Sequence, residues 1–199
     1  MAKTIKLPVV EKDMAFPLMQ SLAQRRSVRR WEDRPISRQD ISNLLWAACG
    51  ITKEAKGKAK SKRTAPSACN AQEIRIFVLI PEGVFKYDEV KHILININDD
   101  DNRKHVGTQK MMKGAPMGLV YVADLSRMTG PFLRSDQAKQ FSAWVDTGFV
   151  SQNVYLYCTA AGMGSVALLL INRDNLREAL RLKEHEKIVM TQAVGYLKK

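Results

Sequence analysis

The chain has 199 residues, of which 45% are hydrophobic and 26% are charged, and its formal net charge is +12. The length and hydrophobic share indicate one globular domain over residues 1–199, and no apolar run is long enough to cross a bilayer. Three cysteines without CxxC spacing and three scattered histidines argue against a disulfide framework and a metal site. The positive charge indicates an anionic partner: a nucleotide, a phosphorylated cofactor, nucleic acid or a membrane surface.

The N-terminal arm, residues 1–16, contains lysines but no apolar stretch of signal-peptide length. The odd number of cysteines fits a reducing compartment, so we expect a cytoplasmic protein, although a signal removed beforehand would leave no trace.

A short helix is predicted over residues 17–24, with a proline in its first turn. The basic segment Arg25-Arg26-Ser27-Val28-Arg29 follows it. If this segment is extended, Arg25, Ser27 and Arg29 leave the backbone on one side, where their guanidinium and hydroxyl groups could surround a phosphate. The alternative is a solvated basic turn, since exposed arginine is common.

Ser37 is a good N-cap for a second helix, which Gly50 ends. Its buried stripe consists of Ile41, Leu44, Leu45 and Ala48. Residues 53–63 then form a basic stretch that we expect to be a mobile loop, and that could contact the phosphate of NADPH through Lys56, Lys58 and Lys60.

The segment Thr64-Ala65-Pro66-Ser67-Ala68-Cys69-Asn70-Ala71-Gln72 combines a rigid proline, small residues and two amides. The amides of Asn70 and Gln72 offer donor and acceptor groups that suit a heteroaromatic ring. The alternative is turn chemistry before a strand, with Asn70 bonding its own backbone.

Further elements follow from hydrophobic periodicity. Strands are predicted over 74–80, 84–87, 117–123, 165–171 and 188–196, and helices over 101–112, 135–163 and 174–182.

The helix predicted over 135–163 is apolar on nearly all faces. Such a helix must be buried on nearly all sides, which favours a central position between two subunits over the core of a monomer. At its end, Ala161-Gly162-Met163-Gly164-Ser165-Val166 leads from helix to strand. The third glycine of a dinucleotide fingerprint is missing and the element order is reversed, so a Rossmann dehydrogenase is disfavoured.

Four motifs in this order resemble the FMN-dependent nitroreductase family, in particular its shorter branch related to thiazoline- and oxazoline-forming dehydrogenases. They are Arg25–Arg29, Ala65–Gln72, Asp146-Thr147-Gly148 through Gln152-Asn153, and Gly162–Ser165. The resemblance implies an α+β fold with a mainly antiparallel sheet flanked by helices. It also implies a homodimer with the long helix at its interface and two shared FMN sites.

The resemblance assigns roles to individual residues. Arg25, Ser27 and Arg29 would hold the FMN phosphate and ribityl chain, with Arg26 beside the flavin. The other implied contacts are Pro66 and Ser67 from the partner subunit, Asn70 at the flavin edge, backbone N–H groups of Ala167, Leu168 and Leu169 near N5, and Lys198 at the phosphate. Where many relatives have a Pro-x-Glu-Gly sequence, residues 167–170 read Ala-Leu-Leu-Leu, which leaves the substrate preference open.

The resemblance implies that a hydride from NADH or NADPH reaches flavin N5 and then a nitroaromatic or quinone-like small molecule, in a ping-pong cycle without a catalytic side chain. One alternative is an FMN-dependent azoline dehydrogenase or reductive dehalogenase on the same fold, and another is a flavin-fold protein without a catalytic role. A nucleic-acid-binding module is the distant alternative, because the basic stretch lacks interleaved stacking aromatics. We therefore expect neither nucleic acid nor membrane as a partner.

Overall fold

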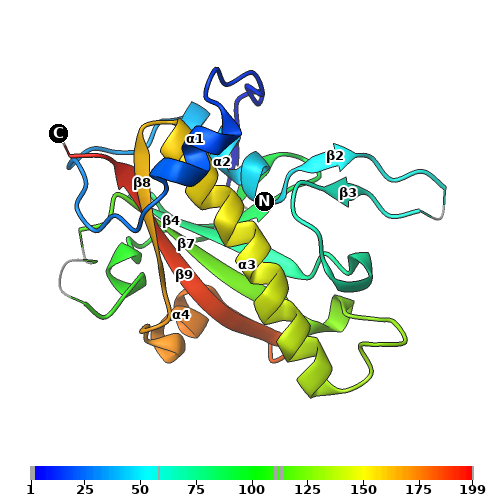
Figure 1. Cartoon of the computed structure of the whole chain (residues 1–199). Coiled ribbons are helices and arrows are strands. Elements are labelled where there is room, and N and C mark those ends of the chain that lie inside the picture. Colours follow the sequence, from blue (N-terminus) through cyan, green and yellow to red (C-terminus); the bar gives the residue numbers. More distant parts are fainter. Residues whose placement is uncertain (1–2, 58, 110–111, 113, 199) are drawn as a thin grey trace.

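The computed structural model describes residues 3–57, 59–109, 112 and 114–198. Its centre is a seven-stranded antiparallel sheet with the order β1-β6-β5-β4-β7-β9-β8, and helices lie against both faces (Figure 1). The strands are β1 (Thr4–Lys6), β4 (Ile74–Ile80), β5 (Gly83–Asp88), β6 (Ile93–Asn98), β7 (Met117–Asp124), β8 (Met163–Leu168) and β9 (Glu186–Tyr196). The predicted α+β class with a mainly antiparallel sheet is confirmed.

Strand β4 shows how the sequence builds two hydrophobic cores. Side chains of successive strand residues point to opposite faces, so Ile74, Ile76 and Val78 enter one core while Phe77 and Leu79 enter the other. This strand is buried on both faces, which explains its nearly continuous apolar sequence.

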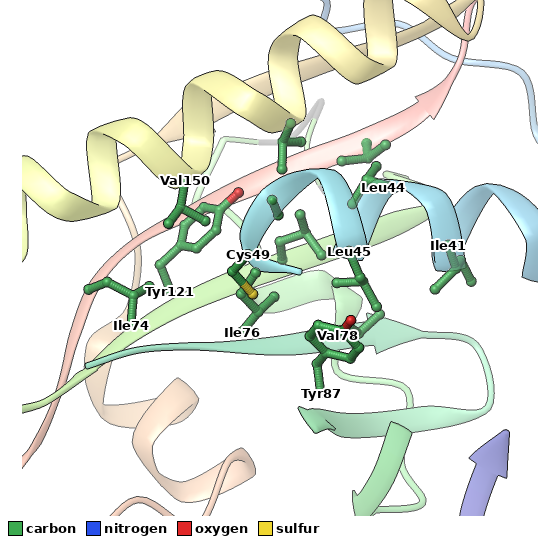
Figure 2. Close-up of a cluster of buried hydrophobic side chains, with 14 of the residues drawn as sticks. Ile41, Leu44, Leu45, Cys49, Ile74, Ile76, Val78, Tyr87, Tyr121 and Val150 are labelled. Atoms are coloured by element: carbon green, nitrogen blue, oxygen red, sulfur yellow. The ribbon is translucent and has the colours of Figure 1, made fainter. Parts of the chain in front are cut away.

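Helix α2 (Arg38–Cys49) covers the first face of the sheet. As the sequence predicts, the Ser37 hydroxyl caps it by accepting a hydrogen bond of 3.0 Å from the Asp40 amide, and Gly50 follows its last turn. Leu44 and Leu45 pack with Ile76 and Val78 in the cluster of Figure 2.

Helix α3 (Asp136–Ala160) crosses the same face of the sheet, beside α2 (Figure 1). Ser135 caps its start by accepting from the Ala138 amide at 3.1 Å. Gly162 follows its end with φ +67°, a left-handed conformation that glycine adopts without steric cost. Strand β8 therefore begins at Met163, earlier than the predicted residue 165.

The second face of the sheet is covered by the short helix α4 (Arg173–Ala179). Its Leu176 packs with Val122, Val166 and Ile188 in the second core. Helix α1 (Leu18–Gln24) lies near the C-terminal half of α3 and leads into the basic segment (Figure 1).

The helix predicted over residues 101–112 is wrong in its described part. The described residues there form the 3₁₀ turn η2 (Arg103–His105) and a second 3₁₀ turn at Met112 in place of an α-helix. Gly107 lies in the middle of the span, and glycine in a helix interior is unfavourable. Residues 110 and 111 lie outside the described residues.

Four strands escaped the sequence analysis: the six-residue β6 and three strands of only two or three residues. In the N-terminal arm β1 pairs with β6, and β2 (Ile51–Lys53) pairs with β3 (Lys62–Arg63) to frame the basic stretch as a hairpin. Lys58 of that stretch lies outside the described residues. Strands of two or three residues carry too little periodicity to be recognised without their pairing partners.

Within the described part of the chain, no helix combines the length and hydropathy of a bilayer span. No group of three or more metal-ligating side chains gathers there either.

Candidate functional site

The basic segment 25–29 lies along the outer edge of β8. The Val28 amide donates to the Ser165 carbonyl at 2.9 Å, and Ser27 forms a parallel bridge with Ser165. Gly164 makes this approach possible, because a Cβ there would lie 2.7 Å from the Val28 Cβ. The first and fourth motifs, which are more than 130 residues apart in sequence, therefore form one surface.

Tyr155 of α3 joins these two motifs through its side chain. Its hydroxyl lies 3.2 Å from the Ser27 hydroxyl and accepts a hydrogen bond of 2.8 Å from the Ala167 amide. The Arg25 guanidinium stacks over the Tyr155 ring at 5.2 Å from its centroid. Arg25 and Ser27 thus face the same way, as the extended backbone predicts.

Positive charge is concentrated on this edge. Arg25 is half-buried against Tyr155, whereas Arg26 and Arg29 are exposed. Trp31 bridges to Leu197, which places the exposed Lys198 beside the same run of chain. Of the three residues assigned to the N5 contact, Leu168 is buried, Ala167 is half-buried and Leu169 is 67% exposed.

The segment from Pro66 to Gln72 forms a tight turn before β4. The Ser67 hydroxyl accepts from the Gln72 amide at 2.9 Å, and the Asn70 side chain donates to the Ser61 carbonyl at 3.1 Å. Cys69 and Asn70 have φ values of 52° and 50°. The Asn70 amide therefore ties the turn to Ser61 instead of bonding its own backbone, and the residue is half-buried.

The third motif anchors this turn. Asp146 of α3 is buried, and its carboxylate accepts a hydrogen bond of 2.8 Å from the Ala68 amide. Because α3 meets the basic segment at Tyr155 and the turn at Asp146, the two regions are separated by about 14 Å along the helix axis. Within one chain, Pro66, Ser67 and Asn70 therefore lie apart from the arginines.

A buried carboxyl that the sequence analysis missed lies beside this anchor. Glu73 is fully buried, and burial, followed by the negative charge of Asp146, raises its pKa to about 7. Both of its carboxyl oxygens are without hydrogen-bond partners among the described residues. An acidic residue directly before an apolar strand was the available signal, but its burial depends on the tertiary structure.

Helix α3 presents an apolar stripe to the outside of the chain. Phe141, Trp144, Val145 and Phe149 are 65%, 61%, 43% and 43% exposed, and they recur at helical spacing. The opposite side of the helix is buried in the core, so both faces are apolar as the sequence indicates. An apolar groove of about 740 Å³ continues this stripe past Trp144 to Leu169 and Met190.

Comparisons with known proteins place the chain in a family. The model of the nitroreductase family matches residues 22–196. A protein of Methanocaldococcus jannaschii that is named as a nitroreductase is 30% identical over 196 residues, covering 94% of this chain and 93% of its own. The chain belongs to the nitroreductase family, which supports an oxidoreductase activity.

Solved structures share the fold. A Ralstonia eutropha protein described as a nitroreductase superposes with a TM-score of 0.88 at 33% identity, covering 98% of this chain and 90% of its own. A Desulfovibrio desulfuricans protein, described as a nitroreductase in complex with FMN, has a TM-score of 0.64 at 22% identity, covering 92% and 87%. At that identity the second likeness shows the fold.

Proposed function

We propose that the protein is an FMN-dependent oxidoreductase that takes reducing equivalents from NADH or NADPH and passes them to nitroaromatic or quinone-like acceptors. The observation that carries this proposal is the contact between the basic segment and β8. The bonds of Val28 to Ser165, and of Ser27 and Ala167 to Tyr155, unite arginines with a glycine-containing turn.

The residues on this edge fit FMN chemically. Arg25, Arg29 and the Ser27 hydroxyl would form a donor set suited to a phosphate dianion, because guanidinium groups bind two phosphate oxygens at once. By the family resemblance, Arg26 and the backbone at 167–169 would lie beside the flavin and Lys198 would add charge at the phosphate. The Ala167 amide already donates to Tyr155, so the N5 contact would fall to the neighbouring amides. Bound FMN would supply the hydride chemistry, so no nucleophilic side chain is required.

The roles of the protein residues follow from charge and orientation. Positive charge from Arg26 or Arg29 near the pyrimidine edge would stabilise an electron-rich flavin, as would a backbone N–H aimed at N5. Tyr155 would orient the Ala167 region and the basic segment relative to one another. The apolar Leu169 and Leu170, which are 67% and 63% exposed, favour an apolar acceptor over a charged one.

We also propose a homodimer in which each flavin site uses both chains. The exposed stripe on α3 is the kind of surface that a second copy would cover. A partner would also supply Pro66, Ser67 and Asn70, which one chain keeps apart from its own arginines.

Absorbance and turnover of the purified protein test the cofactor and the reaction. We expect a flavin spectrum near one equivalent per chain and oxidation of NADH or NADPH with a nitroaromatic or quinone acceptor. Arg29→Ala should lower FMN affinity, with Arg134→Ala, an exposed arginine before α3, as the matched control. A flavoprotein that oxidises neither nucleotide with any acceptor would favour the azoline dehydrogenase, and a colourless protein with salt-dependent affinity for nucleic acid would contradict the flavin proposal.

Subunit mixing tests the shared site. Arg29→Ala and Asn70→Ala should each bind FMN weakly alone. In a shared site, a mixed dimer has one site with both substitutions and one with neither, so unfolding and refolding an equal mixture should restore about one quarter of the flavin sites. Mixing that restores no binding would contradict the shared arrangement.

A further inference from the structure

A basic cavity lies away from the basic segment, beside the β2–β3 hairpin. Its volume is about 590 Å³, and it opens between the hairpin, the start of β4 and the end of β5. Its lining includes five cationic side chains, Lys60, Arg63, Arg75, Lys86 and Arg127, and two acidic ones, Asp88 and Glu89. We call this cavity the arginine pocket.

The acidic groups of the arginine pocket do not neutralise its cations. The Glu89 carboxylate accepts from both Arg63 and Arg75, the latter at 2.8 Å, so one negative charge serves two guanidiniums. The Asp88 carboxylate accepts from the backbone amides of Val90 and Lys91 at 3.0 and 2.9 Å. Among the described residues no ion pair joins Asp88 to either arginine, so the triad of Arg63, Arg75 and Glu89 has one more positive than negative charge.

The guanidinium groups of this triad are held in place. The side chains of Arg63, Glu89 and Arg75 are only 6%, 8% and 15% exposed. The Nε atoms of both arginines are without acceptors among the described residues, so Glu89 does not exhaust their hydrogen-bonding capacity. Fixed, incompletely paired guanidiniums are the donors from which anion sites are built.

Arg127 adds a third guanidinium. It is half-buried, its Nε contacts only the Ala71 carbonyl at 3.5 Å, and it has no carboxylate partner within the described part of the chain. Burial and then the positive charges of Arg75 and Arg63 lower the pKa of Arg127. Repulsion among three guanidiniums is relieved when an anion enters between them.

The remaining walls of the arginine pocket are partly apolar. Ala55, Tyr87, Val90 and Ile95 face the same cavity as the arginines. An apolar wall beside a charged floor is typical of sites for small organic ligands.

We propose that the arginine pocket binds a small organic anion, with its phosphate or carboxylate group on Arg63, Arg75 and Arg127 and its apolar body against Tyr87 and Ile95. The pocket shares no residue with the segment assigned to the FMN phosphate. The proposal therefore does not depend on the FMN phosphate contacts, although Lys60 of the lining is also a candidate NADPH contact and Ser61 and Gln72 of the lining bond Asn70.

Calorimetric titration of the protein, saturated with FMN, tests the proposal. The probes are inorganic pyrophosphate, AMP and benzoate, which separate a bare phosphate, a phosphate on an organic body and a carboxylate. We expect saturable binding of AMP or benzoate, tighter than pyrophosphate because of the apolar wall. The probe that binds best identifies the anionic group.

Arg127→Gln should weaken the best probe about 10- to 100-fold, because it removes a charged hydrogen-bond donor. Lys60→Gln, on the exposed rim of the pocket, should weaken binding of the same probe about 3-fold. This variant tests the proposal if Arg127→Gln does not fold. Arg134→Gln removes the same charge from an exposed site outside the pocket and should leave the affinity unchanged. The proposal is overturned if no probe binds saturably, or if the pocket variants bind like Arg134→Gln.

Discussion

The basic segment and the arginine pocket both contain several guanidinium groups, but these groups differ in solvent exposure and in ion pairing. In the basic segment, Arg26 and Arg29 are exposed, and Arg25 stacks on Tyr155. In the arginine pocket, Arg63 and Arg75 are buried and share the single carboxylate of Glu89. Exposed arginines keep their hydrating water. A buried arginine loses that water, so its charge destabilises the folded protein unless a carboxylate or another acceptor pairs with it.

This difference predicts that the two regions respond to substitution in different ways. Changes in the arginine pocket should first affect stability, because its charges are removed from water. Changes along the β8 edge should affect FMN binding more than stability. The following substitutions test that contrast, from the largest expected effect to the smallest.

Glu89→Gln should give the largest loss of stability. It leaves two buried guanidiniums without a counterion, which costs about 3–5 kcal/mol when one partner of a buried pair is removed. Urea unfolding measures the change. Glu82→Gln, which breaks the exposed pair with Arg38, is the control and should cost less than about 1 kcal/mol. Equal losses of unfolding free energy in the two variants would mean that breaking the buried ion pairs of Glu89 costs no more than breaking an exposed pair.

Gly164→Ala should separate the basic segment from β8. The new Cβ would lie 2.7 Å from the Val28 Cβ and 2.9 Å from a Leu197 methyl, so we expect a loss of about 1–3 kcal/mol and weaker FMN binding. Thermal unfolding and fluorescence titration with FMN measure the two effects. Gly114→Ala is the control, because a Cβ there meets nothing within 4 Å. Unchanged FMN affinity in Gly164→Ala would argue against the site at this edge.

Glu73→Gln should change how stability depends on pH. Because burial raises the folded pKa of Glu73 from 4.5 to about 7, the folded chain holds a proton that the unfolded chain releases. Stability should therefore fall as pH rises from about 4.5 to about 7, and stay level above it. In Glu73→Gln this slope should disappear, with a gain on the order of 1–3 kcal/mol at pH 8.

Urea unfolding across pH 5–8 measures the slope, with Glu54→Gln, an exposed position in the hairpin, as the control. A slope that is the same in the wild type and Glu73→Gln would show that another group carries it.

Tyr155→Phe should give the smallest change in stability. It removes the hydroxyl that bonds Ser27 and the Ala167 amide, at a cost of about 1 kcal/mol. We expect a clearer effect on FMN affinity, because both ends of this bridge belong to the candidate flavin site. Tyr157→Phe, which loses a contact to Asp40 of α2, is the matched control and should leave FMN affinity unchanged.

Much of the fold follows from local patterns. Ser37 and Ser135 were recognisable as caps or helix starts, and the apolar run of β4 indicated a buried strand. The helix expected over 101–112 was wrong: the structure has 3₁₀ turns at Arg103–His105 and at Met112, with Gly107 between them, and hydrophobic periodicity does not record the low helix propensity of glycine.

The candidate site was only partly predictable in the same way. The sequence pointed to the basic segment and to the glycine turn, and the structure brings these together at the edge of β8. Tyr155 lies within the apolar helix predicted over 135–163, and no motif sets it apart there. Its role depends on the tertiary structure, which brings both Ser27 and the Ala167 amide within hydrogen-bond distance of the Tyr155 hydroxyl.

The sequence by itself determined the capped helices and the four motifs, because caps, turns and side-chain periodicity act over a few residues. The antiparallel α+β class was implied by the family resemblance that those motifs carry. Only the tertiary structure decided that Glu73 is buried, that Glu89 serves two arginines, and that the outer stripe of α3 remains exposed. These features depend on which distant segments exclude water from a side chain. Whether a side chain is buried, and whether an opposite charge lies beside it, depends on the packing of residues that are far apart in the sequence.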